Sequence, residues 1–134
     1  MKLKFFMPIK PPTVTHQEKQ VHVVKGKPVF YEPEELKNAR AKLMSALARH
    51  IPEIPFDGPL FLCCDWYFPV TGKHTNGEYK TTKPDTDNLN KLLKDCMTAM
   101  KFWKDDAQVC MEVITKYYAD VPGIRITVSN IDER

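Results

Sequence analysis

The run GPLFLCCDWYFPV, residues 58–70, constrains the fold of this chain more than any other segment. Apolar residues occupy both alternating sets of positions along it, and its aromatic residues favour extended backbone. A strand that is apolar on both sides is typical of the centre of a sheet whose two faces are both covered. We therefore expect a central strand here, with other strands beside it and other elements packed on both of its faces.

Four further segments are expected to be extended. Each is short and rich in β-branched or aromatic residues, and each is bounded by Pro, Gly or polar residues. The second of them contains a Lys-Gly-Lys turn between two short runs, which predicts a hairpin. Prolines 11 and 12 end the first, and a Val-Pro-Gly turn joins the last two. The expected bounds are 2–9, 21–32 (the hairpin), 108–119 and 123–131.

Two segments carry apolar stripes at helical spacing. The first begins near Pro33, which suits a first turn, and Glu34 and Glu35 follow at the positive end of the helix dipole. Its stripe consists of Leu36, Ala39, Leu43, Met44, Leu47 and Ala48. The second helix is expected over residues 86–100, and its stripe consists of Leu89, Leu92, Leu93, Cys96, Met97 and Met100.

The order of these elements, β-β-β-α-β-α-β-β, predicts an α+β fold in which two main helices pack on a mixed sheet. A chain of 134 residues suits a single domain, 1–134. Its hydrophobic content of 43% and charged content of 28% are typical of a globular protein. No apolar run reaches the roughly 18 residues of a membrane-spanning helix. Because proline also breaks the N-terminal segment too early for a signal peptide, we expect a cytoplasmic protein without a membrane partner.

Two aspartates, Asp85 and Asp87, stand one residue apart just before the second helix. Pro84 biases the residue before it towards an extended shape. If the chain stays extended through Asp87, both carboxylates point the same way. Such a pair repels itself, and a divalent cation, which prefers oxygen ligands, removes that cost. The alternative is that Asp87 simply caps the helix.

A second acidic pair, Asp105 and Asp106, lies between the second helix and the next strand. A strand packed beside the start of the helix would bring this pair close to Asp85 and Asp87. Three or four carboxylates gathered at one point are more typical of a metal site than of a helix cap. The residue types therefore favour a metal centre, with capping left open as the alternative.

Lys91 lies four residues after Asp87 and four residues before Asp95, so all three share one face of the helix. One interpretation is an exposed ladder of ion pairs. The other is an ammonium group beside the metal carboxylates, where it would bind a phosphate or stabilise developing charge. The residues alone leave both interpretations open.

The segment KPDTDNLNKLLKDCMTAMKFWKDDAQV resembles the signature of the RusA-type Holliday-junction resolvases. That signature is approximately D-x-D-N-L-x-K, an aspartate four residues on, and then, after a short gap, W-x-D-D-x-Q-V. The matching residues are Asp85, Asp87, Asn88, Leu89, Lys91, Asp95, Trp103, Asp105, Asp106, Gln108 and Val109. The early MPIKPPT also resembles the proline-containing start of such proteins.

The resemblance implies a small homodimeric endonuclease of RusA-like fold that resolves four-way DNA junctions by paired symmetric nicks, in DNA recombination and repair. It implies Mg²⁺ as the metal, with Mn²⁺ as a substitute, and no small-molecule cofactor. Its catalytic carboxylates correspond to Asp85, Asp87 and Asp106, and its essential lysine to Lys91. Asp105 corresponds to a further member of the metal site. Such a protein is expected in the cytoplasm of a bacterium, encoded by a phage, a prophage or the host.

Basic residues of the loop before the second helix are expected to flank each site and to neutralise DNA phosphates. Because phosphate contacts carry no sequence information, the shape of the junction would be the main signal. Two alternatives stay open: a nuclease for flaps, forks or other branched DNA, and a non-catalytic relative that binds junctions. The aromatic residues at 66–68 are expected to be buried strand residues and not a base-stacking platform. The expected DNA contacts are Lys73, His74, Lys80 and Lys83.

Overall fold

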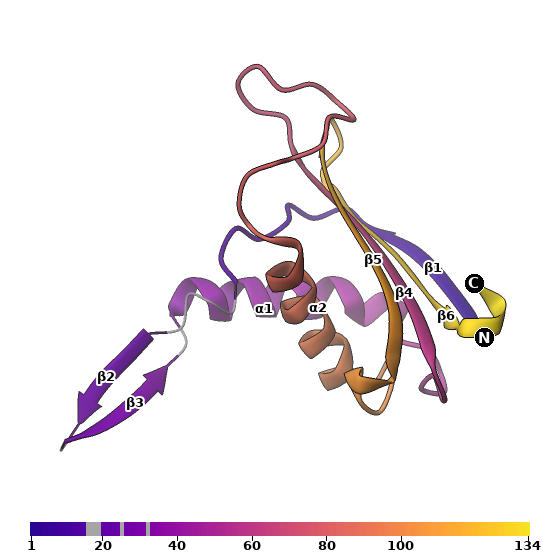
Figure 1. The fold of residues 1–134 in the computed structure, drawn as a ribbon, viewed down its shortest axis with the longest axis horizontal. Helices are drawn as coiled ribbons and strands as arrows, with labels where there is room; N and C mark the ends of the chain where they lie inside the picture. The colour runs from indigo at the N-terminus through magenta and orange to yellow at the C-terminus, as the bar shows by residue number, and fades with distance from the viewer. Residues whose placement is uncertain (16–19, 25, 32) are drawn as a thin grey trace.

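A computed structural model describes residues 1–15, 20–24, 26–31 and 33–134 of the chain. Its element order confirms the predicted β-β-β-α-β-α-β-β sequence (Figure 1). Residues 25 and 32 of the expected hairpin lie outside the described residues. The strands are β1 (Lys2–Met7), β2 (Gln20–Val24), β3 (Lys27–Tyr31), β4 (Leu60–Pro69), β5 (Val109–Ala119) and β6 (Gly123–Asn130). The helices are α1 (Glu34–Leu47) and α2 (Thr86–Ala99), with short 3₁₀ turns at Ala48–His50, Asp106–Gln108 and Ile131–Glu133.

Four strands form one mixed sheet in the order β1-β6-β4-β5. Strand β4 is antiparallel to β6 and parallel to β5, and β1 is antiparallel to β6. A parallel pair needs a long crossover connection, and α2 lies within the one that joins β4 to β5. Among the described residues, strands β2 and β3 pair with each other and with no other strand, and their hairpin stands apart from the main sheet in Figure 1. The fold is thus α+β, as the sequence predicts.

Strand β4 is central, but the prediction that both of its faces are covered was wrong. Every second residue from Leu60 to Phe68 is buried, whereas the intervening residues are only half-buried. Both helices lie on one side of the sheet (Figure 1). The second face carries Asp65 and Tyr67, whose polar groups suit contact with water. Trp66 and Phe68 are buried as expected, and Tyr67 is half-buried on the open face.

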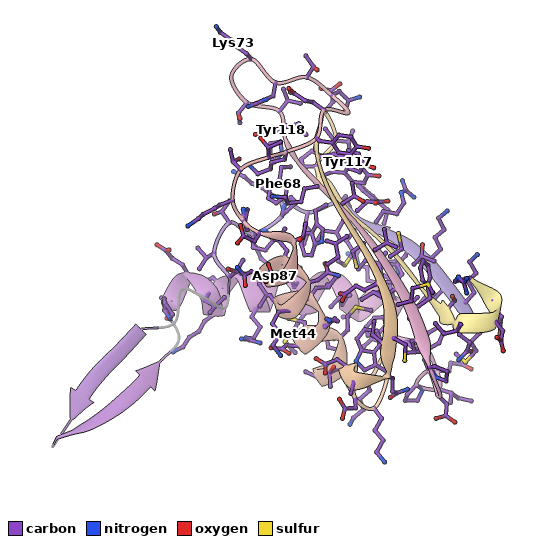
Figure 2. All side chains as sticks on the ribbon, in the orientation of Figure 1. Met44, Phe68, Lys73, Asp87, Tyr117 and Tyr118 are labelled. Atoms are coloured by element: carbon purple, nitrogen blue, oxygen red, sulfur yellow. The ribbon has the colours of Figure 1, made fainter. Side chains whose placement is uncertain are left out.

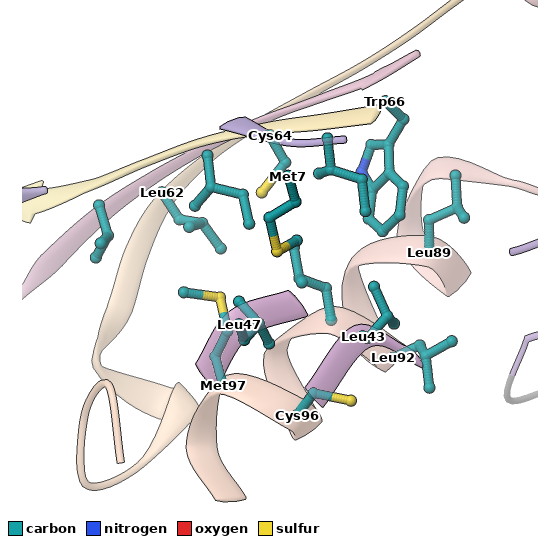
Figure 3. Packing of buried hydrophobic residues seen from close by; sticks show 14 of the residues in the cluster. Met7, Leu43, Leu47, Leu62, Cys64, Trp66, Leu89, Leu92, Cys96 and Met97 are labelled. Carbon is teal, nitrogen blue, oxygen red and sulfur yellow. The ribbon is translucent and has the colours of Figure 1, made fainter. Parts of the chain in front are cut away.

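The core lies between the two helices and the covered face of the sheet (Figure 3). Leucines of both predicted helical stripes are fully buried there, against Met7, Leu62, Cys64 and Trp66 of the sheet. The expected stripes are therefore the packing faces of the helices, except that Ala48 lies beyond the end of α1 and is exposed, and Met100 lies beyond the end of α2. No helix in the described part of the chain is long and apolar enough to cross a membrane.

A chain of polar contacts connects α2 to the sheet beneath it. The Trp66 indole N–H donates to Asn90 Oδ1 over 2.8 Å, and the Asn90 amide donates to Glu112 Oε2 over 2.6 Å. Lys94 Nζ donates to the other Glu112 oxygen over 3.1 Å. Asn90 is almost completely buried. Because these bonds join one face of the helix to β4 and β5, they fix the rotation of α2 about its axis.

Candidate active site

Asp85 and Asp87 lie at the first turn of α2, in two different backbone environments. Asp85 is the N-cap residue, with extended backbone at φ −71° and ψ 150°, and Asp87 is the second residue of the helix. The Lys83–Pro84 peptide bond before them is cis. The condition that the chain stays extended through Asp87 is not met, because the helix begins at Thr86, as its expected bounds already placed it. The two carboxylates are neighbours by helix geometry and not by strand alternation.

The alternative reading of Asp87 as the helix cap is also wrong. Asp85 occupies the N-cap position, and its side chain makes no capping hydrogen bond. Within the described residues, neither the Asp85 nor the Asp87 carboxylate takes part in a hydrogen bond or an ion pair, and both side chains are exposed. The start of α2 thus presents two exposed carboxylates that no hydrogen bond or ion pair engages in the described part of the chain.

The second acidic pair divides into two different roles. Asp105 caps the short 3₁₀ turn: its Oδ1 accepts from the Ala107 N–H over 2.9 Å, and its own N–H donates to the Gln108 side chain. Gln108 in turn donates to the carbonyl groups of Phe56 and Gly58. The half-buried Asp106 has no such bond within the described residues. Of the pair, Asp106 is therefore the better candidate for a ligand.

The two acidic pairs do not meet within one chain. They stand at opposite ends of the 14-residue helix α2, which is about 21 Å long. The start of α2 lies beside the C-terminal half of β5, where Lys116 Nζ donates to the Pro84 carbonyl over 2.8 Å. Asp105 and Asp106 precede the other end of that strand. The expectation that all four gather at one point of the chain was wrong, and the described residues contain no group of three or more side chains placed to hold a metal ion.

Lys91 pairs with Asp95, with 3.2 Å between Nζ and Oδ1. Only this half of the expected ladder is formed, because the described contacts include no ion pair between Lys91 and Asp87. The Lys91 side chain is 58% exposed. Such an exposed pair contributes little to stability, so its ammonium group can exchange Asp95 for another anion at small cost.

Lys116 is a cation beside the acidic pair that the sequence analysis missed. Its Nζ donates to the carbonyl groups of Thr82 and Pro84, over 2.7 and 2.8 Å, and so holds the segment that leads into Asp85. Burial lowers its pKa, as does the nearby charge of Lys80. Strand alternation would have found it, because Lys116 lies two residues from the buried Tyr118 and so faces the helices.

The four basic residues expected to bind DNA differ in the contacts that their side chains make within the chain. Lys73 is exposed at the tip of the loop (Figure 2), and Lys83 is exposed near the start of α2. Lys80 Nζ donates to Thr82 and lies 5.1–5.2 Å from the ring centroids of Phe68 and Tyr118. The remaining residue, His74, binds Glu78 and stacks on Tyr118 at 4.1 Å. Lys73 and Lys83 are thus open to a ligand, whereas Lys80 and His74 help to hold the loop.

The loop is fixed along the outer edge of β5. The Gly77 N–H donates to the Tyr118 carbonyl, the Tyr118 N–H donates to the Glu78 carbonyl, and the Lys80 N–H donates to the Lys116 carbonyl. Within the described part of the chain, these bonds cover the edge of the strand at residues 116–118. From Val109 to Thr115 the described residues leave that edge without a strand partner.

Comparison with known proteins identifies the family of this chain. A crossover junction endodeoxyribonuclease from Lactococcus phage r1t is 29% identical over 133 residues, which cover 98% of this chain and all of that protein. The uncharacterized protein YqaN of Bacillus subtilis strain 168 is 26% identical over 117 residues, which cover 79% of this chain and 82% of that protein. The family model of endodeoxyribonuclease RusA matches residues 8–129, which include both acidic pairs and Lys91. The chain therefore belongs to the RusA family of endodeoxyribonucleases.

Proposed function

We propose that the protein is a metal-dependent nuclease that resolves four-way DNA junctions by paired nicks, in recombination and repair. Family membership supports a nuclease, and the name of the phage relative supports a crossover junction as the substrate. The observation that carries the proposal is the pair of exposed carboxylates, Asp85 and Asp87, which form no hydrogen bond or ion pair among the described residues. By its phage relative, the protein would act in the cytoplasm of a bacterium, from a phage or prophage gene.

The donor groups fit a hard divalent cation. Carboxylate oxygens are the ligands that Mg²⁺ and Mn²⁺ prefer. Asp85, Asp87 and Asp106 would hold the ion, and Asp105, with one oxygen committed to its cap, is the weaker candidate. A bound ion of this kind lowers the pKa of a water molecule and stabilises charge on a phosphate.

Lysines of this chain would bind phosphate groups and position the acidic pair and the DNA. Lys91 would exchange Asp95 for the phosphate under attack and stabilise the charge that develops on it. Lys116 would keep Asp85 in place, because it anchors the Pro84 carbonyl just before it. Lys73 and Lys83 would neutralise phosphates of the DNA arms and position the substrate without reading its sequence.

A homodimer would complete the site. Each chain carries a half-site at either end of α2, so Asp106 can join Asp85 and Asp87 only if it comes from a second copy. A two-fold axis would form two such shared sites, because the start of each α2 then meets the end of the other. A four-way junction has approximate two-fold symmetry itself and needs two cuts.

The free part of β5 is the surface that would bring the half-sites together. The uncovered stretch Val109–Thr115 has Glu112 at its midpoint and exposes Met111 and Val113, at 39% and 46%. An open strand edge with apolar side chains favours pairing with another strand. Antiparallel pairing of two copies about Glu112 would carry the partner's Asp106 towards the loop and the start of α2.

Cleavage of synthetic DNA tests the function. Four-way junction, duplex, flap and fork would each be incubated with Mg²⁺ or with EDTA, using wild type, Asp87→Asn and Asp120→Asn. Asp120 is a matched control, because it is an exposed aspartate that belongs to neither acidic pair. We expect symmetric paired nicks in the junction, lost with EDTA and with Asp87→Asn but kept with Asp120→Asn.

Other outcomes point elsewhere. Preferred cutting of flaps or forks would replace the junction as substrate and keep the nuclease. Tight junction binding without cutting in either Mg²⁺ or Mn²⁺ would rule out the enzyme and leave a structure-specific binding protein.

A further inference from the structure

Three tyrosine rings form a column on the open face of the sheet, next to the proposed site. The rings of Tyr67 on β4 and Tyr117 on β5 are stacked, with centroids 5.4 Å apart and 16° between planes. Tyr79, on the loop, stacks on the other side of Tyr117 at 5.3 Å and 23°. The two contacts follow the strand pairing, because Tyr117 is the register partner of both residues. The column therefore crosses the sheet and ends at Tyr79.

The last ring of this column is open. Tyr67 and Tyr117 are half-buried, whereas Tyr79 is 67% exposed. The backbone around Tyr79 is held at both sides, since Glu78 accepts from the Tyr118 N–H and Lys80 donates to the Lys116 carbonyl. A flat aromatic surface is thus presented to solvent on a fixed segment, with its inner face already occupied. Such a surface can receive a second flat ring with little loss of conformational freedom.

The surroundings of Tyr79 favour a nucleobase as the second ring that stacks on it. Tyr79 lies six residues before Asp85 on the same loop, and Lys80 and Lys83 lie between them. Strand alternation puts Tyr79 and Tyr117 on the open face and Lys116, which holds the Pro84 carbonyl, on the helix side. The edge of β5 therefore separates the tyrosine column from the acidic pair. A DNA strand that crosses this edge could bring its phosphate to the acidic side and its base to Tyr79.

We propose that Tyr79 binds an unstacked nucleobase next to the phosphate that is cut, and so recognises the branch point of the substrate. This inference rests on the proposed function and adds a source of structural selectivity to it. A base within continuous duplex is stacked on its neighbours and cannot turn around the strand edge. A base at a branch point loses stacking partners, so it reaches the tyrosine ring at a smaller cost. Aromatic stacking accepts every base, which suits recognition by shape.

Binding and crosslinking in Ca²⁺ test the inference separately from cleavage. Junction and duplex affinities would be measured for wild type, Tyr79→Phe, Tyr79→Ala and Val121→Ala. Val121 is a matched control, because it is equally exposed, at 66%, and lies outside the tyrosine column. We expect Tyr79→Ala to weaken junction binding roughly tenfold and to leave duplex binding unchanged. Tyr79→Phe and Val121→Ala should bind like wild type.

The direct readout uses 5-iodouracil at the branch point, with ultraviolet crosslinking and peptide mapping. We expect a crosslink to the peptide that contains Tyr79, and none from the same base inside a duplex arm. Equal junction affinity of wild type and Tyr79→Ala, or crosslinks elsewhere, would overturn this inference even if the wild type cuts junctions normally. A wild type that crosslinks to the branch point through the Tyr79 peptide but does not cut the junction would overturn the proposed function alone. A wild type that binds no branched DNA would overturn both the proposed function and this inference.

Discussion

The side-chain amide of Asn90 on α2 donates a 2.6 Å hydrogen bond to the Glu112 carboxylate on β5. The same Asn90 accepts from the Trp66 indole, so one buried amide joins the helix to two strands. Its removal would leave an indole donor without a partner in the core and would free α2 to rotate. That rotation would turn Asp87 away from its present direction, although Asn90 itself would touch neither metal nor DNA.

We expect Asn90→Leu to lower the free energy of unfolding by about 2 kcal/mol, because the indole N–H stays buried and unsatisfied. Lys94→Met removes only a partly exposed pair with Glu112 and should cost under about 1 kcal/mol. Urea denaturation compares the two variants. Equal losses would show that the amide does not connect the helix to the sheet as described.

Substitutions of Asp105 and of Asp106, the second acidic pair, should have different effects on cleavage. Serine is also a favoured cap, so Asp105→Ser should keep both stability and cleavage close to wild type. Asp106→Ser should keep stability and reduce cleavage on the order of a hundredfold. Thermal melts and junction cleavage rates check both statements. Greater loss of cleavage from Asp105→Ser than from Asp106→Ser would reverse the assignment of the ligand.

A mixture of two inactive variants tests whether the site is shared between chains. In a heterodimer of Asp87→Asn and Asp106→Asn chains, both substitutions fall in one shared site and the other site is intact. We therefore expect the mixture to recover nicking of one strand, while each variant alone stays inactive. If each chain held its own complete site, the mixture would stay as inactive as its components.

The edge of β5 can be tested without disturbing the core. Met111→Lys combined with Val113→Lys places charge on two side chains that are already exposed. We expect a folded monomer by light scattering, with unchanged circular dichroism and no junction cleavage. Ile54→Lys is the matched control at another exposed apolar side chain, 70% accessible, and should leave the oligomeric state of wild type unchanged. A double variant that still dimerises would place the interface elsewhere.

The carboxyl group of Asp65 gives a pH dependence that does not involve the site. Burial raises its pKa above the ordinary value of 3.8, although Arg125 and Lys4 oppose the shift. Because the folded pKa lies above the unfolded one, folding favours the protonated form, and stability falls as the pH rises through the window just above 3.8. We expect Asp65→Asn to be more stable than wild type at pH 7 and to lose this advantage below pH 3.8. Urea denaturation at several pH values measures the difference, and an advantage independent of pH would contradict it.

Much of the fold could be predicted from local patterns. The apolar spacing of Leu89, Leu92 and Leu93 fixes the buried face of α2, and the expected bounds of 86–100 agree closely with Thr86–Ala99. What failed was an inference about one strand taken alone. The apolar residues of β4 do not show whether a second layer covers the face of the sheet that carries Tyr67. That face is stabilised by contacts between neighbouring aromatic rings and is partly exposed to water.

The candidate site shows a different limit. The signature residues could be found from the chain, but their distances from one another depend on the path of the crossover connection. The predicted helix already separated its two flanking acidic pairs by about 21 Å, because a helix rises about 1.5 Å per residue. Lys116 was missed for the opposite reason, since it is distant along the chain and reaches Pro84 only through the parallel pairing of β4 and β5.

The position of one half-site at each end of α2 has a consequence for how the DNA would be cut. In the proposed dimer every α2 helix would connect the two sites, so the spacing between them would depend on a rigid rod and not on a loop. About four helical turns would act as a molecular gauge of about 21 Å, comparable with the width of a DNA duplex. One inserted residue in α2 would change this gauge by about 1.5 Å and turn one half-site by about 100° relative to the other. The symmetry of the two incisions would then be encoded in the length of a single helix.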